Sequence, residues 1–60
     1  MAASQIGSEI LVIDDSSTIR RSAEIFLSQA GHPVILAVDG FAALSLIVER
    51  RPLLIFCDIL

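Results

Sequence analysis

Three short runs of uninterrupted aliphatic residues constrain the fold of this chain more than any other feature. They cover Ile10–Ile13, Val34–Val38 and Leu53–Cys57, and each has the length of a β-strand. A strand that is apolar at every position is covered by other structure on both faces. These runs therefore predict a parallel sheet with helices on either side.

The segment after the first run has the apolar spacing of a helix. One stripe of that helix holds Ile19, Ala23, Phe26, Leu27 and Ala30. Ser16 or Ser17 can cap its start by accepting a hydrogen bond from a free backbone N–H group. Gly31 suits a left-handed helix end, and Pro33 prevents the helix from continuing.

A second helix is predicted between the second and third runs. Asp39 can cap its start, and Pro52 breaks it. Arg50 and Arg51 lie at its carboxyl end, where positive charge suits the helix dipole. We expect its buried stripe to hold Ala43, Leu44, Ile47 and Val48.

The predicted order is thus β-α-β-α-β. Strands that alternate with helices indicate an α/β fold with a doubly wound parallel sheet and right-handed crossovers. Residues 1–8 are small and polar and are interpreted as a flexible leader, which leaves residues 9–60 as one domain. A chain of this length buries only about 60% of its unfolded surface, so its stability is expected to be marginal.

Charge and composition argue against several classes of function. The net charge of −3 disfavours direct binding of nucleic acid, which requires a basic surface. No apolar run approaches the roughly 20 residues that span a bilayer, and no cationic residue precedes the first run. The lone Cys57 cannot form an internal disulfide, and we expect it to be a small buried side chain. These features predict a cytoplasmic protein.

Two of the predicted strands end in acidic residues. Asp14 and Asp15 follow the first strand, and Asp58 follows the third. Open parallel sheets bind ligands beyond the carboxyl ends of their strands, so these carboxylates converge if the two strands are neighbours. Mg²⁺ with its preference for oxygen ligands relieves the repulsion between them. A carboxylate beside such an ion is a plausible nucleophile toward a phosphoryl group.

Other phosphate-binding motifs do not match. A dinucleotide site needs a glycine-rich motif where this chain has the segment from Asp14 to Ser17, and a P-loop needs a lysine, which is absent from the whole sequence. Phosphatases of the haloacid dehalogenase type also place an aspartate after an apolar strand. They require a second aspartate two residues later, where Ser16 follows Asp14, so this remains the weaker alternative.

Three motifs together resemble the amino-terminal part of a CheY-like response-regulator receiver domain. They are Ile10–Ser16, Asp39–Leu44, which is similar to the family's D-G-x-x-A-L, and Pro52–Asp58. The resemblance covers residues 9–60. The segment from Ser16 to Glu24 is most similar to the small regulators of pilus-based twitching motility.

The resemblance implies a truncated flavodoxin-like sheet with strand order 2-1-3 and a role for each acid. Asp58 would accept a phosphoryl group from a histidine kinase in a two-component phosphorelay. Asp15 would bind Mg²⁺ directly and Asp14 would assist, with Asp58 itself and the backbone carbonyl of Leu60 as further ligands. The protein would be a phosphoacceptor signalling domain rather than an enzyme.

The sequence departs from the family in what it lacks. The family's fourth strand carries a serine or threonine and its fifth a lysine that contact the phosphoryl group, and neither strand is present. The third strand then becomes an exposed apolar edge, through which the chain can self-associate. A truncated fragment that is not phosphorylated, or an interaction module, therefore remains the main alternative.

Overall fold

The computed structural model describes residues 8–58 as five alternating strands and helices. In chain order these are β1 (Ile10–Ile13), α1 (Ser17–Gln29), β2 (Val34–Ala37), α2 (Gly40–Arg50) and β3 (Leu54–Cys57). The strands form one parallel sheet in the order β2-β1-β3. The predicted fold class and strand order are confirmed, and the predicted second and third strands were each one residue too long.

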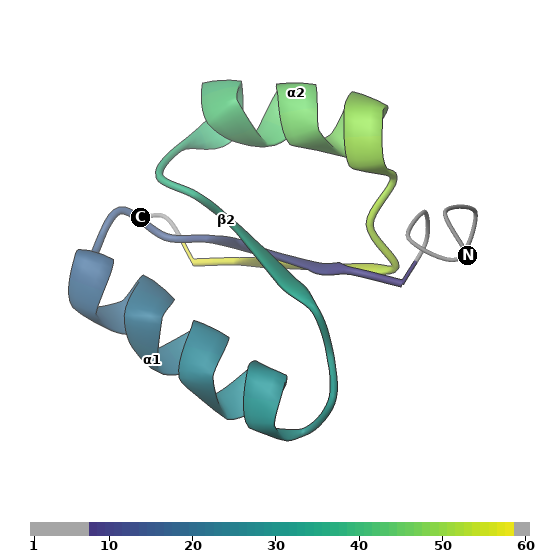
Figure 1. Cartoon of the computed structure of the whole chain (residues 1–60). Helices are drawn as coiled ribbons and strands as arrows, with labels where there is room; N and C mark the ends of the chain where they lie inside the picture. The colour runs from purple at the N-terminus through teal and green to yellow at the C-terminus, as the bar shows by residue number, and fades with distance from the viewer. Residues whose placement is uncertain (1–7, 59–60) are drawn as a thin grey trace.

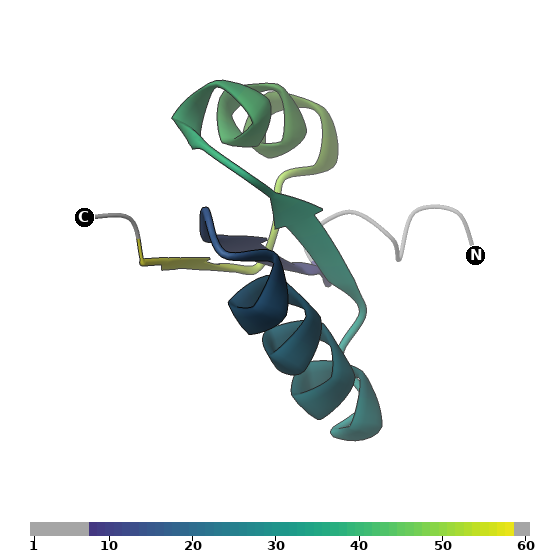
Figure 2. The ribbon, with the colours of Figure 1, turned by 90° about the vertical axis from the view of Figure 1, so that its left-hand side faces the viewer.

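The helices lie on opposite faces of the sheet. Figure 1 shows α2 on one side and α1 on the other, with the sheet between them. The view turned by 90° in Figure 2 shows the same three layers. This placement explains why the strands lack polar alternation, because β1 is covered by a helix on each face.

Strand β1 is the centre of the fold. All four of its residues are buried, and the side chain of Leu11 has no exposed surface. Leu11 and Ile13 form the core with Ala37 and Ala43 on the α2 face of the sheet. A central strand has neighbours on both edges and helices on both faces, so β1 is shielded more completely than any other described element.

Capping groups set the ends of both helices. The Ser16 hydroxyl accepts a hydrogen bond from the N–H of Ile19 at 3.3 Å, and the Asp39 carboxylate accepts one from Ala42 at 2.9 Å. Ser16 rather than Ser17 is therefore the first cap, and the predicted role of Asp39 is confirmed. Gly31 follows α1 with φ of +92°, the left-handed conformation expected there.

The end of α2 was not fully predicted. Arg51 has the left-handed conformation with φ of 48°, and its N–H donates to the carbonyl of Ile47 at 3.0 Å. Pro52 disfavours helical geometry at the residue before it, so the chain leaves the helix at Arg51.

The burial predictions for α2 and Cys57 were partly wrong. In α2, Ala43 is buried, but Leu44 and Val48 are 61% and 77% exposed. Cys57 is exposed rather than buried. The three described strands form a sheet too narrow to cover these side chains. Strand β3 is an edge strand that packs mainly against β1.

An ion pair at the amino end of the sheet was not predicted. Arg50 donates from Nε to Oε1 of Glu9 at 3.0 Å and from Nη2 to Oε2 of the same carboxylate. The Glu9 side chain is 6% exposed and the Arg50 side chain 41% exposed. This bidentate contact ties the end of α2 to the residue before β1.

We expect Arg50→Met to lower the free energy of unfolding by about 1–2 kcal/mol, because it leaves the buried Glu9 carboxylate unpaired. This is less than for a fully buried pair, since water reaches Arg50. Arg21→Met removes an exposed pair with Glu24 and should change stability by less than about 0.5 kcal/mol. Urea unfolding of both variants checks this, and equal effects would contradict it.

Candidate functional site

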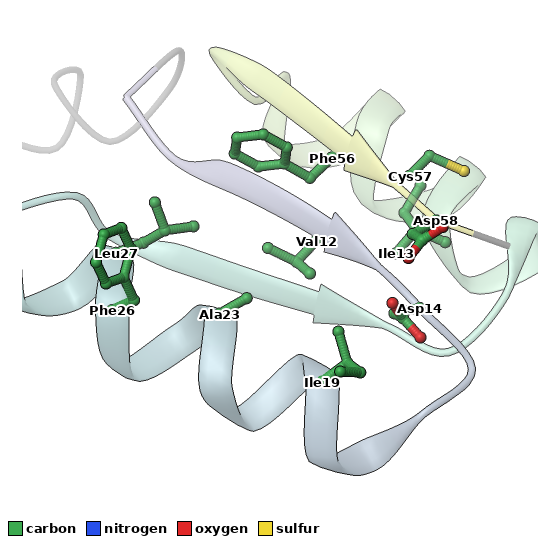
Figure 3. Close-up of a pocket in the computed structure, with 10 residues that line it drawn as sticks. All are labelled: Val12, Ile13, Asp14, Ile19, Ala23, Phe26, Leu27, Phe56, Cys57 and Asp58. Atoms are coloured by element: carbon green, nitrogen blue, oxygen red, sulfur yellow. The ribbon is translucent and has the colours of Figure 1, made fainter.

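The carboxyl ends of β1 and β3 bring two of the predicted acids to one edge of the sheet. Ile13 pairs with Cys57 in the parallel register, so Asp14 and Asp58 follow adjacent positions of neighbouring strands. The N–H of Asp58 donates to the carbonyl of Ile13 at 3.0 Å. Figure 3 shows both carboxylates at the same end of a pocket. The convergence expected from the sequence is thus present for this pair.

Asp14 is buried and held by hydrogen bonds. It is 4% exposed, and its Oδ1 accepts a hydrogen bond from the N–H of Ser16 at 2.9 Å. Its own N–H donates to the carbonyl of Ala37 at 3.2 Å. The side chain is therefore oriented by the turn between β1 and α1 before any ligand binds.

The other predicted site residues are less constrained. Asp15 and Asp58 are both exposed, Asp15 in the turn after β1 and Asp58 directly after β3. Leu60, whose carbonyl was predicted as a ligand, lies outside the described residues. The site thus combines one buried, oriented carboxylate with two that have freedom to rotate.

An apolar pocket adjoins the acids. It has a volume of about 320 Å³ and lies between α1 and the sheet. Apart from Asp14 and Asp58, its lining is apolar or weakly polar: Val12, Ile13, Ala23, Leu27, Cys57 and the exposed side chains Ile19, Phe26 and Phe56. Figure 3 shows Phe26 and Leu27 at the end of the pocket away from Asp14.

The acids fit Mg²⁺ by their chemistry, since carboxylate oxygens are the ligands this ion prefers. Within residues 8–58, however, no three acidic, histidine or cysteine side chains are already gathered closely enough to hold an ion. Binding would need Asp15 and Asp58 to turn toward Asp14, which their exposure permits. Oxygen ligands are present at one edge, and the ligand set is not preassembled.

Arg20 is a contact of the site that the sequence analysis missed. Its Nη1 donates to the backbone carbonyl of Asp14 at 2.7 Å, across the turn that joins β1 to α1. A pair of adjacent arginines such as Arg20 and Arg21 is equally typical of a solvated helix face. The available signal was the place of Arg20 in the first turn of the helix that follows Asp14 and Asp15. That turn lies directly beside the end of β1.

Comparison with known proteins gives three informative relatives. Protein PilG of Pseudomonas aeruginosa is 52% identical over 54 residues, which is 90% of this chain and 40% of PilG. The probable transcriptional regulator ycf27 of Porphyridium aerugineum is 46% identical over 52 residues, and response regulator MprA of a Mycobacterium species is 43% identical over 51. The latter two alignments each cover 22% of the relative.

These relatives are response regulators, and the stretch they share with this chain is consistent with a CheY-like receiver domain. The β2-β1-β3 strand order agrees with that of receiver domains. The chain spans less than half the length of these relatives. No protein-family model and no solved structure matches it. No helix within residues 8–58 is long and apolar enough to cross a membrane.

Proposed function

We propose that this receiver sequence serves two-component phosphorelay signalling, with Asp58 as the acceptor of a phosphoryl group from a histidine kinase. The observation that carries the proposal is the position of Asp58 at the carboxyl end of β3, next to the buried and oriented Asp14 at the end of β1. Asp58 is exposed, so a donor can reach its carboxylate.

In the proposed reaction a carboxylate oxygen of Asp58 attacks the phosphorus atom. The new bond joins that oxygen to phosphorus, and the bond from phosphorus to the donor atom breaks with its electron pair. Asp14, Asp15 and the carbonyl of Leu60 would hold Mg²⁺ beside Asp58. Mg²⁺ held by these residues would supply positive charge next to the phosphoryl oxygens. Asp14 is suited to anchor it because the Ser16 N–H already orients its carboxylate.

The resemblance to receiver domains supports the proposed donor and cellular setting. Histidine kinases use ATP, so we place the reaction in the cytoplasm. The similarity of the segment from Ser16 to Glu24 to pilus-motility regulators, together with the match to PilG, supports a role in twitching motility. We propose no direct contact with nucleic acid, since the net charge is −3.

Acetyl phosphate with Mg²⁺ tests the proposal on the 60-residue chain. We expect intact mass spectrometry to show one added phosphoryl group, removed by hydroxylamine because an aspartyl phosphate is an acyl phosphate. Omission of Mg²⁺ should abolish the addition. The proposal for this chain would be contradicted if the chain stays unmodified while the dispersed NMR signals of the β1 amides show that it is folded.

A second candidate is a non-phosphorylated interaction module that pairs with a second copy of the chain. Strand β3 favours this reading, because it is a sheet edge and all four of its residues are exposed and uncharged. The sequence also lacks the lysine that the family places against the phosphoryl group.

We expect the chain to self-associate through β3, with a weighted-average mass in light scattering that rises with concentration. Ile55→Lys places a charge on this edge and should restore the monomer. Val48→Lys is the matched control on exposed α2 and should leave association unchanged. A monomer at every concentration, or equal effects of the two variants, would contradict self-association through β3.

A further inference from the structure

The described arginines have different partners, and only Arg20 contacts the acidic edge. Arg21 pairs with Glu24 on the surface of α1, and Arg50 pairs with Glu9 at the amino end of the sheet. Arg51 follows α2, next to Pro52 and away from the strand ends that carry the acids. Arg20 donates to the carbonyl of Asp14 at 2.7 Å.

This hydrogen bond acts on the peptide group between Asp14 and Asp15. The N–H of Asp14 is held by Ala37, and its carboxylate is held by the N–H of Ser16. The backbone carbonyl of Asp14 accepts the hydrogen bond from Arg20. The three contacts together fix the plane of the peptide from which Asp15 begins.

The direction of the Asp15 side chain depends on that peptide more than the direction of the Asp14 side chain does. It is exposed, and within the described part of the chain its carboxylate has no recorded hydrogen bond or ion pair. Where a side chain has no contact of its own, the backbone alone sets the direction in which it leaves the chain. The contacts of Asp14 therefore restrict where the Asp15 side chain leaves the backbone, while its carboxylate remains free to rotate.

We propose that Arg20 is a positioning residue, which holds the Asp14–Asp15 peptide so that the Asp15 carboxylate can bind a divalent cation together with Asp14. The inference rests on the proposed function, since it concerns the ion that supports phosphoryl transfer to Asp58. Groups that orient metal ligands affect metal affinity by about 10- to 100-fold.

The charge of Arg20 and its hydrogen bond have opposite effects on cation affinity, which makes the positioning role testable. A guanidinium group repels a nearby divalent cation, so loss of its charge alone would tighten binding. Loss of its hydrogen bond would weaken binding, because Asp15 would no longer be presented. Arg20→Met removes both, whereas Arg20→Lys keeps the charge and a donor but loses the planar, rigid arrangement of donors.

Mn²⁺, used as the probe ion, and NMR of the full 60-residue chain separate these effects. We expect Arg20→Met to weaken Mn²⁺ binding about tenfold, judged by paramagnetic broadening of the Asp14 and Asp58 amides, and Arg20→Lys to lie between it and the wild type. Arg21→Met is the matched control and should change affinity less than twofold. Spectra without metal should show shifted Asp15 and Ser16 amides in Arg20→Met only, with the β1 amides unchanged.

The outcomes separate this inference from the proposed function. Unchanged or tighter Mn²⁺ binding in Arg20→Met, with binding intact in the wild type, would overturn the positioning role alone. An absence of Mn²⁺ binding in the wild type would overturn both. Equal changes in Arg20→Met and Arg21→Met would also overturn the inference, because a general effect of charge would then explain them.

Discussion

Asp58→Asn is expected to abolish phosphorylation of this chain by acetyl phosphate. The carboxamide has no anionic oxygen to attack phosphorus, and its size is nearly that of the carboxylate it replaces. Asp58 is exposed and makes its recorded hydrogen bond through the backbone N–H, so the substitution should leave the fold intact. Intact mass spectrometry, with and without hydroxylamine, measures the loss.

Asp39→Asn is the matched control for that experiment. Asp39 is also an exposed aspartate beyond a strand end, and it caps α2, a role that asparagine fills equally well. We expect this variant to be phosphorylated like the wild type. Persistent modification of Asp58→Asn would contradict the proposed acceptor. Phosphatase turnover that is lost in Asp14→Asn and kept in Asp58→Asn would instead support the haloacid dehalogenase alternative.

Leu11→Ala is expected to have the largest effect on stability. Leu11 is fully buried in β1 and belongs to the core between the sheet and α2. Truncation of a buried leucine costs about 2–5 kcal/mol through lost transfer energy and the cavity that remains. A chain of this size has little stability to lose, so we expect most of the molecules to be unfolded at room temperature.

Leu44→Ala makes the same chemical change at a position that is 61% exposed on α2. It should alter the free energy of unfolding by less than about 0.5 kcal/mol, since little packing is lost and alanine favours a helix. Circular dichroism during urea unfolding compares the two variants. Similar destabilisation by Leu11→Ala and Leu44→Ala would mean that β1 does not form the core of the fold.

Local features of the fold could be predicted from the sequence because they depend on neighbouring residues. The apolar run of Ile10–Ile13 predicts a strand covered on both faces, and β1 has those bounds. Asp39 and Gly31 act at helix ends through the conformations and hydrogen bonds of one turn. Their partners lie within a few residues, so the sequence pattern already contains them.

Burial and pairing depended instead on which elements meet in space. Leu44 and Val48 have the spacing of a buried stripe but remain exposed, because spacing places side chains on a face without deciding what covers it. The Glu9–Arg50 ion pair joins residues 41 positions apart, which no local pattern predicts.

The candidate site divides in the same way. Sequence alone identified Asp14, Asp15 and Asp58 as acids at strand ends, since an apolar run followed by a carboxylate is a local pattern. Only the tertiary structure decided that Asp14 is buried while Asp15 and Asp58 are exposed, and that Arg20 holds the Asp14 carbonyl. The reason is physical: residue type sets the chemistry of a group, whereas its orientation and access to water depend on the packing of neighbouring strands and helices.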